Sequence, residues 1–575
     1  MKKDETKGDP EARRSASQIL FHHLPEQTVD IDRGVWKVAK WRDPRRESGV
    51  DLAALTVAVL EQARPWTDQQ RDNGFGARLA SGSRKLEILS LARDRGIDVE
   101  PFPKLWVCSN NRCERVHASP DSLCRCGDRS SRNQIHFVCY CRECGALAEP
   151  PIARCPTHRE VRIRFPGTMA ADRIVQDCPA PGCGRELRRG FAGKSCPNCN
   201  QKMEAQVHRA ASVYTPRGVS IINPPSDTAR ERIERAGGSA QALSWVVSGL
   251  TTRWMDQARP GVATLRQTLA HQGFSEGMIA DTVASAIARG EVAPDIETSV
   301  PAAVRLAAES EARQIAVGLA EARATLVDLI ATAPPGLQGI YTNSYPHWLA
   351  RAGLEAVDFV DRFPVLTGQF GYTRGPSNDP TSSVLVPFAS PYGDYAVYGE
   401  MNETEALFVR LDPLAVAKWL RAQHIDVPAA ATAVEARMAI LGAIGADPTG
   451  GVVELVDTLV HSFAHRFVRI AAVHTGVERS ALSEFLAPHH LAFFVFAAGR
   501  GDFVMGGIQA VFEGELHNLL REIVEGERRC PLDPGCGQNG AACVACLHLG
   551  EPSCRKFNRQ LNRETLHGPR GYLMP

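Results

Sequence analysis

The stretch CPAPGCGRELRRGFAGKSCPNC, residues 178–199, decides how the middle of this chain folds. Its four cysteines form two short pairs that are separated by twelve residues, and they are Cys178, Cys183, Cys196 and Cys199. Proline lies within the turns of both pairs and glycine within that of the first, as is typical of tight turns. A short pair of this kind supplies two thiolates from one turn, and a second pair completes a tetrahedral zinc site. The stretch therefore predicts a zinc ribbon.

The other cysteines are clustered in the same way. The chain has 17 cysteines, of which twelve lie between Cys108 and Cys199 and five between Cys530 and Cys554. Cysteines that only fill an apolar core would be scattered along the chain. In a reducing cytoplasm such thiols do not form structural disulfides. The two clusters therefore predict metal binding.

Two further sets of ligands precede the first ribbon. One set has knuckle spacing and consists of Cys141, Cys144, Cys155 and His158, with Cys139 as an alternative to the histidine. The other set ends in an unusually tight pair and consists of Cys108, Cys113, Cys124 and Cys126. Exchange of ligands between these two sets stays open, because spacing alone does not fix the pairing.

The C-terminal cluster offers five thiols for four positions, and these are Cys530, Cys536, Cys543, Cys546 and Cys554. Cys543 and Cys546 have knuckle spacing, whereas Cys536 is either a ligand or the spare thiol. An iron–sulfur cluster is the main alternative to zinc here. All four predicted sites have enough donors to fill every position, which is typical of structural zinc. We expect about four Zn²⁺ ions per chain, each contributing on the order of 10 kcal/mol to folding.

The charge of the cysteine-rich block bears on nucleic-acid binding. The whole chain has a net charge of +1, but Lys104 to Arg217 contains 19 Lys or Arg residues and 10 Asp or Glu residues. A four-thiolate zinc site carries about two negative charges, so three sites leave the block mildly basic. The residues predicted to contact phosphate lie in one ribbon loop and are Arg185, Arg188, Arg189 and Lys194. The alternative is that this loop is only solvated and binds no phosphate. Arg374 is a further candidate, and both it and Arg410 either contact phosphate or brace the fold.

Composition and hydrophobic periodicity indicate an α+β, multidomain protein. The predicted parts are a mixed N-terminal segment over 1–100 with 1–15 disordered, a zinc-ribbon array over 101–225, a helical region over 226–345, and a mixed α/β zinc-binding domain over 346–575. The predicted helices are Ser83–Arg95, Ala229–Met255, Val262–Arg289, Val300–Ile330, Leu414–Ala422, Val452–His474 and about Ile508–Glu525. The predicted strands are Val384–Phe388, Ala406–Arg410 and Leu491–Ala498.

Sequence motifs for catalysis are lacking. Gly193-Lys194-Ser195 resembles the end of a phosphate-binding loop, but the earlier glycine is missing and Cys196 follows. His461 and His465 share one face of a predicted helix, but without an evident third ligand we favour a polar face or an internal hydrogen-bonded pair. The polar start of the chain is no signal peptide, and its apolar stretches are too short to span a bilayer. We therefore expect a soluble cytoplasmic protein that is not an enzyme.

The C-terminal sequence resembles a known family. His461-Ser462-Phe463-Ala464-His465, then Gly506-Gly507, then Cys530 to Cys554 and Phe557-Asn558-Arg559 look like the MrfA-type zinc-binding domain, which occurs beside or fused to superfamily 2 helicases. Gly371 to Gly375, and Thr404 to Asp412 ahead of Trp419, resemble the helicase-free, DrmB-like subunits of the DISARM anti-phage system. The resemblance implies a DNA-engaging partner of a DrmA-like DNA helicase, and it transfers no catalytic residues.

Three functional hypotheses follow. The first is an accessory subunit of a DNA helicase in anti-phage defence. The second is a free-standing nucleic-acid-binding regulator built on zinc ribbons. The third is a cryptic nuclease centred on His461, His465 and Asp502. The first predicts copurification with a helicase, the second predicts salt-dependent DNA binding without a partner, and the third predicts metal-dependent cleavage.

Overall fold

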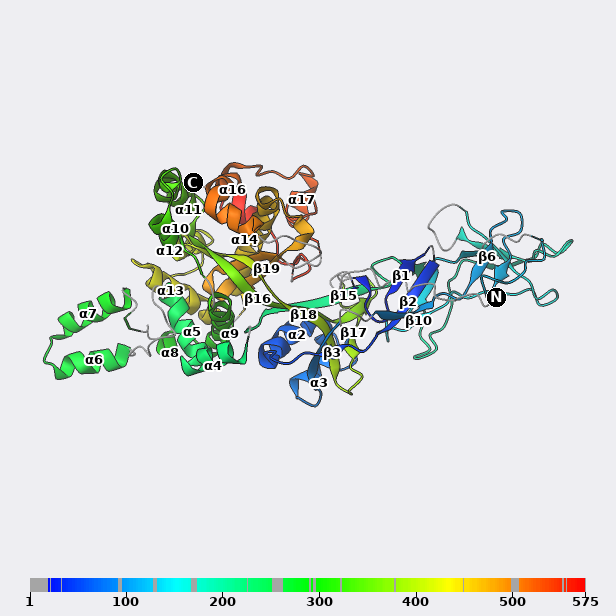
Figure 1. Cartoon of the computed structure of the whole chain (residues 1–575), viewed down its shortest axis with the longest axis horizontal. Coiled ribbons are helices and arrows are strands. Elements are labelled where there is room, and N and C mark those ends of the chain that lie inside the picture. The colour runs from blue at the N-terminus through cyan, green and yellow to red at the C-terminus, as the bar shows by residue number, and fades with distance from the viewer. Residues whose placement is uncertain are drawn as a thin grey trace, which may run out of the picture. The chain divides into compact units, whose positions relative to one another are not determined.

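A computed structural model describes residues 19–573 except 21, 33, 92–95, 128–131, 167–172, 225, 251–261, 289–290, 293–295, 321–322, 377–378, 448, 498–505, 551–552 and 555. The chain is a multidomain mixture of helices and strands, which confirms the predicted α+β class (Figure 1). It divides into two compact units. Unit 1 comprises Met1–Ser48, Leu55–Val219 and Thr367–Glu400, and unit 2 comprises Gly49–Ala54, Ser220–Leu366 and Met401–Pro575.

The predicted domain ranges distribute over these two units. The predicted zinc-ribbon range 101–225 falls almost entirely in unit 1, and the predicted helical range 226–345 falls in unit 2. Predicted disorder over 1–15 lies outside the described residues. Among the helices that the structure describes, none combines the length and apolar character needed to cross a membrane.

Unit 1 contains four small antiparallel sheets of three strands each. The first consists of β1 (Thr28–Ile31), β2 (Gly34–Trp41) and β5 (Ile97–Pro101). The other three form the cysteine-rich block. In one of them, β6 (Trp106–Cys108) lies between β7 (Val116–His117) and β8 (Arg132–Gln134). In the second, β9 (Phe137–Tyr140) lies between β10 (Leu147–Ala148) and β14 (Glu204–Val207). In the third, β12 (Val175–Asp177) lies between β11 (Arg162–Arg164) and β13 (Glu186–Arg189).

A larger sheet has strands in both units. Its long members are β15 (Thr215–Ile222), β16 (Leu354–Arg374) and β18 (Tyr395–Leu411), and each contributes residues to unit 1 and to unit 2. Within unit 1, the end of β16 pairs with β17 (Val384–Ala389), which pairs with the start of β18. Within unit 2, the end of β18 pairs with β20 (Ala492–Ala497), and β20 pairs with β19 (Leu482–Ala487). The predicted strands over 384–388 and 406–410 are thus confirmed, and the one predicted over 491–498 is confirmed from Ala492 to Ala497, with Leu491 in the preceding turn.

The predicted helix over Ser83–Arg95 is wrong. Leu86–Ser90 forms strand β4, which pairs in parallel with β18 from Leu86 opposite Tyr395, and in antiparallel fashion with β3 (Arg45–Arg46). Leucine favours a helix in isolation, but here four consecutive residues, Leu86 to Leu89, are all buried. Tertiary pairing overrides the local preference. Nearby lie α2 (Leu52–Thr67) and α3 (Phe75–Ala80).

The helices of unit 2 are mostly shorter than predicted. The helix predicted over Ala229–Met255 is divided into α4 (Asp227–Arg235) and α5 (Gly238–Val247), and its predicted end lies outside the described residues. The helix predicted over Val262–Arg289 is divided into α6 (Val262–His271) and α7 (Glu276–Ala288). The helix predicted over Val300–Ile330 is divided into α9 (Ala302–Leu319) and α10 (Leu326–Thr332). Thr325 starts α10 with a capping box in which its side chain and that of Asp328 exchange hydrogen bonds with the backbone. Such a cap fixes a new helix start.

The remaining part of unit 2 surrounds one long helix, α14 (Gly451–Thr475), as predicted. Its apolar face packs in a large core against β18, β19 and β20 and against the helices that follow. The other helices of unit 2 are α8 (Ile296–Ser299), α11 (Tyr345–Arg351), α12 (Pro413–Ala422), α13 (Ala433–Ala446), α15 (Gly507–Ala510), α16 (Leu516–Glu525), α17 (Gly535–Gln538) and α18 (Glu564–His567). A π-helical turn over Val511–Glu515 joins α15 to α16 and accounts for the predicted helix over 508–525.

Candidate metal centres

The described residues include four thiol-rich groups, and the donor atoms within each group are close enough to bind one metal ion. Within each group, all donor atoms lie within 4.8 Å of one another. Three groups belong to unit 1 and one to unit 2. They are Cys108, Cys113, Cys124 and Cys126; Cys141, Cys144, Cys196 and Cys199; Cys155, His158, Cys178 and Cys183; and Cys530, Cys536, Cys543 and Cys546.

The distances between donors match a shared ion. The Cys113 and Cys124 sulfurs are 3.4 Å apart, the Cys141 and Cys199 sulfurs 3.5 Å, and the Cys536 and Cys546 sulfurs 3.7 Å. A disulfide would require about 2.05 Å. Donors at about 2.0 to 2.3 Å from a tetrahedral Zn²⁺ are roughly 3.3 to 3.8 Å from each other. The groups are therefore compatible with closed, structural zinc sites.

The predicted pairing of the knuckles is wrong for two of these groups. The knuckle of Cys141 and Cys144 faces the knuckle of Cys196 and Cys199. Their predicted partners, which are the pairs Cys155 with His158 and Cys178 with Cys183, instead face each other. The reason is strand pairing: β9 runs into the first knuckle and pairs with β14, which follows the second. The inner ribbon, from Cys155 to Cys183, is thus inserted into the outer ribbon. Sequence proximity favoured the wrong partner because closure of the outer ribbon is long-range.

Six knuckles of unit 1 share one backbone conformation. In every case the residue directly after the second ligand has a positive φ, between 49° and 79°, and these residues are Glu114, Gly127, Gly145, Arg159, Gly184 and Asn200. In five knuckles the N–H of the first ligand also donates to the carbonyl two residues after the second, as from Cys141 to Ala146 at 2.9 Å. The left-handed residue turns the chain so that both donors point to one side.

Hydrogen bonds and burial set the proton affinity of these thiols. The backbone N–H of His158 lowers the pKa of Cys155 to about 6. Burial instead raises the pKa of Cys108 to about 12. The guanidinium of Arg115 lies 3.4 Å from the Cys113 sulfur. Because zinc binds thiolates, loading of such groups releases protons and weakens in acid.

The fourth candidate donor of the inner ribbon is His158, and Cys139 lies outside the four thiol-rich groups. The Nδ1 atom of His158 lies 3.5 Å from the Cys155 sulfur and 3.4 Å from the Cys178 sulfur. Cys139 is fully buried on β9, opposite Ala148 and Ala205 in the neighbouring strands. Burial raises the pKa of Cys139 to about 11, so this thiol behaves as a small apolar side chain.

The C-terminal group uses four of its five cysteines. Cys536 is one of the four, and its sulfur lies 3.7 Å from that of Cys546. Cys554 lies elsewhere, beside His461, His465 and Glu484. The sequence carries two signals for this second cluster, namely the histidine pair and a glutamate within the apolar strand Leu482–Ala487.

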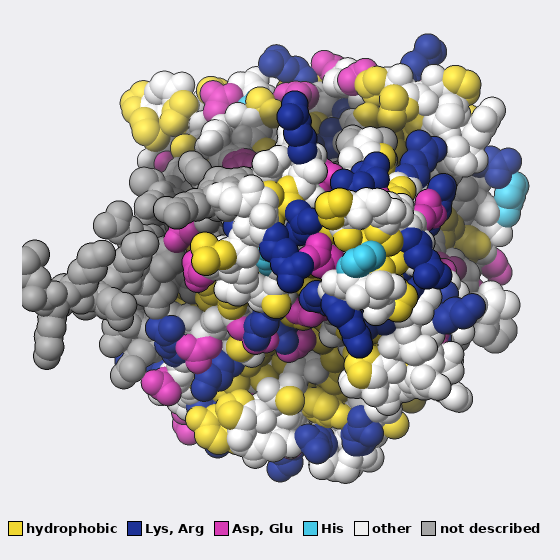
Figure 2. Space-filling view, turned by 90° about the vertical axis from the view of Figure 1, so that its right-hand side faces the viewer, with side chains coloured by type: hydrophobic (Ala, Val, Ile, Leu, Met, Phe, Trp, Pro, Cys, Tyr) yellow, Lys and Arg dark blue, Asp and Glu magenta, His cyan; other side chains and the backbone are white. Residues whose placement is uncertain are grey.

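The predicted phosphate contacts of the ribbon loop differ in exposure. Arg185 and Arg189 are exposed, and Arg189 pairs with Glu186 at 2.7 Å. Lys194 donates to the Glu149 carbonyl at 2.6 Å, and Arg188 donates to the Ala192 carbonyl. Figure 2 views the side of the molecule that carries β6, and Lys and Arg side chains crowd its middle with Asp and Glu among them. The surface is basic but interspersed with acidic groups.

The prediction that Arg374 contacts phosphate is wrong. Its side chain is only 1% exposed, and its guanidinium donates to the backbone carbonyls of Val213, Gly145 and Glu26. It also stacks over the Tyr372 ring at 4.8 Å. All of its donors point into unit 1, so Arg374 joins three separate chain segments of that unit.

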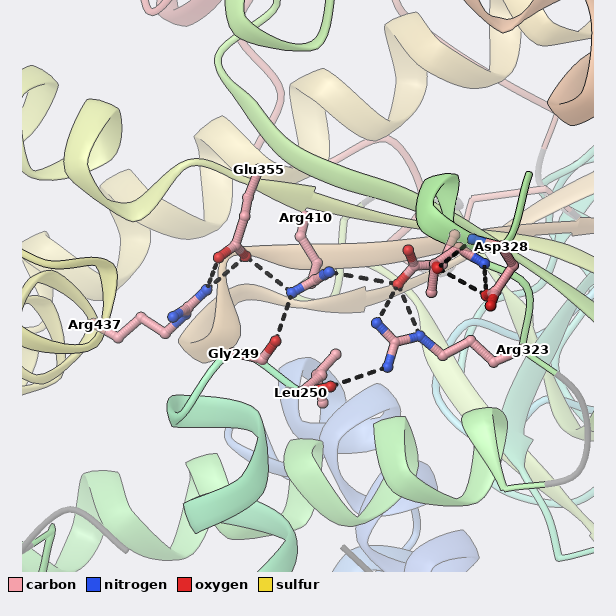
Figure 3. Close-up of polar contacts among 9 residues, drawn as sticks. Gly249, Leu250, Arg323, Asp328, Glu355, Arg410 and Arg437 are labelled. Carbon is pink, nitrogen blue, oxygen red and sulfur yellow. Dashed lines mark hydrogen bonds and ion pairs between the residues drawn. The ribbon is translucent and has the colours of Figure 1, made fainter. Parts of the chain in front are cut away.

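Arg410 belongs to a buried ionic network in unit 2 (Figure 3). It lies 3.0 Å from Glu355 and 3.5 Å from Asp358. Arg437 also pairs with Glu355, and Arg323 with Asp358 at 2.8 Å. The three guanidiniums further donate to carbonyls at and just after the end of α5, those of Val247, Gly249 and Leu250. Helix C-terminal carbonyls accept such bonds well, so Arg410 braces the fold.

Two arginines of this network keep the Glu355 carboxylate ionised. Burial raises the pKa of Glu355, but Arg410 and Arg437 outweigh that effect and hold the pKa below its ordinary value. The carboxylate therefore stays charged in the interior, and its loss would remove the counter-charge that Arg437 and Arg410 share, leaving Arg410 with Asp358 alone.

Comparisons with known proteins agree with part of the resemblance. Residues 15–215 match the model of a domain of unknown function, DUF8724. The chain is 25% identical over 179 residues to the DISARM protein DrmB of Bacillus paralicheniformis, which covers 28% of this chain and 31% of that protein. The chain thus aligns with less than a third of this relative.

Proposed function

We propose that this chain is a non-catalytic, zinc-stabilised subunit that works with a DrmA-like DNA helicase and helps it to engage DNA in anti-phage defence. The similarity to DrmB supports the defence role. The observation that supports the non-catalytic part is that each of the four thiol-rich groups brings four donors within 4.8 Å of one another, as a closed tetrahedral site requires. Catalytic zinc keeps a position open for water or substrate, and these groups leave none.

Zinc is the metal we assign to these groups, at one ion per group. Sulfur and imidazole donors in a tetrahedron suit Zn²⁺, and an iron–sulfur cluster at Cys530 to Cys546 is the alternative. With three sulfurs and one imidazole in the inner ribbon, that site carries one negative charge rather than two. The block therefore remains basic enough for weak contact with phosphates. We further propose that residues 346–575 correspond to an MrfA-type zinc-binding domain.

Copurification tests the helicase partnership. We expect a tagged chain to retain the DNA helicase encoded beside it through gel filtration, and to hydrolyse no ATP when pure. Loss of the helicase from the complex, or ATP hydrolysis by the isolated chain, would overturn the proposal.

A free-standing DNA-binding regulator is the second candidate, favoured by the exposed Arg185 and Arg189. It requires salt-dependent DNA binding without a partner. The double variant Arg185→Ala/Arg189→Ala should weaken such binding. The matched control is Arg235→Ala, since Arg235 on α4 has an equally exposed side chain, at 71%. Equal DNA affinity of both variants would count against any role of the ribbon loop.

The nuclease hypothesis has little physical support. The side chains of His461 and His465 are fully buried, so neither imidazole reaches a substrate from solvent. Asp502, the third member of that hypothesis, lies outside the described residues.

A further inference from the structure

A second kind of donor cluster lies inside unit 2, apart from the thiol-rich groups. His461 and His465 are one turn apart on α14, and their rings are perpendicular with centroids 4.4 Å apart. Glu484 comes from β19, and Cys554 from the loop after the C-terminal thiol group. All four side chains are buried, and their donor atoms lie within 4.8 Å of one another. Three distant segments thus bring two nitrogens, one oxygen and one sulfur together.

The distances between these donors have the size of tetrahedron edges. The Nε2 atom of His461 lies 3.1 Å from Oε1 of Glu484 and 3.3 Å from the Cys554 sulfur. The Nε2 atom of His465 lies 3.3 Å from the same carboxylate oxygen. Ligands of one Zn²⁺ at about 2.0 to 2.3 Å are separated by roughly 3.3 to 3.8 Å, or slightly less for nitrogen and oxygen pairs.

The backbone orients His465 as a ligand. Its Nδ1 atom lies 2.9 Å from the Leu547 carbonyl, which only accepts hydrogen bonds, so Nδ1 carries a proton. The Nε2 atom of a neutral His465 then has a free lone pair that points at the cluster. Metal-binding histidines are held by this kind of hydrogen bond from the other ring nitrogen. The Cys554 sulfur accepts the backbone N–H of Asn558 at 3.2 Å, as metal-bound thiolates do.

Hydrogen bonding alone satisfies this cluster poorly. If Nε2 of His465 donated to Glu484, the ring would be a buried imidazolium, because Nδ1 already donates. Nε2 of His461 faces both the carboxylate and the sulfur and can donate to one of them. Among the described residues, Nδ1 of His461 and Oε2 of Glu484 have no hydrogen-bond partner. Buried polar atoms without partners are costly.

A divalent cation resolves the competition among the donors that face one another: it binds both Nε2 atoms, the Glu484 carboxylate and the Cys554 thiolate, so that no buried imidazolium is needed. One thiolate and one carboxylate cancel the two charges of the ion, and two neutral imidazoles complete the set. The site is then electrically neutral, as a fully buried position requires. Sulfur and imidazole donors exclude Mg²⁺ and Ca²⁺ and suit Zn²⁺.

We propose that His461, His465, Glu484 and Cys554 bind a further Zn²⁺ ion as a structural clamp. The ion joins α14 and β19 to the C-terminal loop, which also carries the thiol-rich group of Cys530 to Cys546. All four positions are filled by the chain, so the site is closed to substrate. The proposal does not depend on the helicase partnership.

Zinc content tests the clamp. Native mass spectrometry of the full-length chain should give one zinc fewer for Glu484→Gln than for the wild type, because an amide is a poor ligand and leaves the site charged. The matched control is Glu522→Gln. Glu522 also pairs with a histidine of α14, His474, at 3.0 Å, but at the surface. The control should keep the wild-type zinc content, and an equal content in Glu484→Gln would overturn the proposal.

Cadmium NMR keeps the proposal falsifiable if Glu484→Gln does not fold. The wild-type chain loaded with ¹¹³Cd should show, besides the resonances of four-sulfur and three-sulfur sites, one resonance far upfield of them. Replacement of sulfur by nitrogen and oxygen causes such a shift. A spectrum without this resonance would overturn the proposal.

Discussion

The sulfurs of Cys141 and Cys199 lie 3.5 Å apart although the two residues are 58 positions apart in the chain. This contact closes the outer ribbon around the inner one. Between the two residues, the chain forms a complete second set of donors, from Cys155 to Cys183. The nested arrangement can be tested directly, because it differs from a local arrangement in which each knuckle closes with the next one.

Cys199→Ser and Cys183→Ser should affect different sheets. In the nested arrangement, Cys199→Ser opens the outer ribbon and exposes β9 and β14, while β12 and β13 keep their protection. Cys183→Ser should do the reverse. Each variant should also lose about one zinc. Hydrogen–deuterium exchange followed by mass spectrometry measures both sheets in one experiment, and increased exchange of β12 and β13 in both variants would instead support local pairing.

Arg374→Ala should destabilise unit 1 without a specific effect on DNA binding. Its guanidinium donates to three backbone carbonyls, two in buried and one in partly buried surroundings, so the variant should lose about 3 kcal/mol of unfolding free energy. Arg189→Ala is the control, because an exposed arginine at the surface contributes within about 0.5 kcal/mol. Chemical denaturation measures both. A stable Arg374→Ala protein with weakened DNA affinity would contradict the assignment.

Glu355→Gln should destabilise unit 2 by about 3 to 5 kcal/mol, because it leaves Arg410 and Arg437 buried without this counter-charge. The control is Glu231→Gln, whose carboxylate forms an exposed pair with Arg235 at 3.9 Å. Thermal unfolding of the two variants should differ clearly. Equal melting temperatures would show that the network in Figure 3 contributes little to stability.

The stability of unit 2 should fall in acid through His567. Burial, together with Arg466, Arg528 and Arg563, lowers the pKa of His567 to about 3. The unfolded chain therefore takes up this proton below about pH 6.5, whereas the folded chain resists protonation until about pH 3. The contribution of His567 to the free energy of unfolding is therefore complete above about pH 6.5 and declines as the pH falls below that value. Because the ring is partly accessible, we expect a loss on the order of 1 to 2 kcal/mol at pH 5.

His567→Gln should reduce this pH dependence, since glutamine does not titrate. The measurement is the difference in unfolding free energy between pH 7 and pH 5 for the variant and the wild type. Zinc loss in acid affects both proteins alike and cancels in the comparison. An identical difference in both proteins would exclude His567 as a contributor.

Local features of the fold could be predicted from the sequence. The knuckles, the long helix α14 and the apolar strand β20 each follow from spacing or periodicity within a short stretch. Leu86–Ser90 was misassigned because its partner strand begins at Tyr395, more than 300 positions away. Arg374 was misassigned because a positive charge gives no indication of whether buried carbonyls surround it.

The candidate sites show the same division. Cysteine spacing predicts which thiols form knuckles, but the pairing of β9 with β14 decides which knuckles meet. The mixed cluster is harder still, because His461, Glu484 and Cys554 come from three segments with no common spacing. One usable signal was a glutamate in an otherwise apolar strand, since a buried charge requires a partner.

The insertion of one ribbon into another imposes an order on synthesis at the ribosome. Cys126 emerges early enough for the first group to close alone, and Cys183 later completes the inner ribbon. Cys141 and Cys144 must wait for Cys196 and Cys199 while more than 50 residues are added. At about 5 to 20 residues per second, this knuckle is exposed for several seconds before its partner arrives.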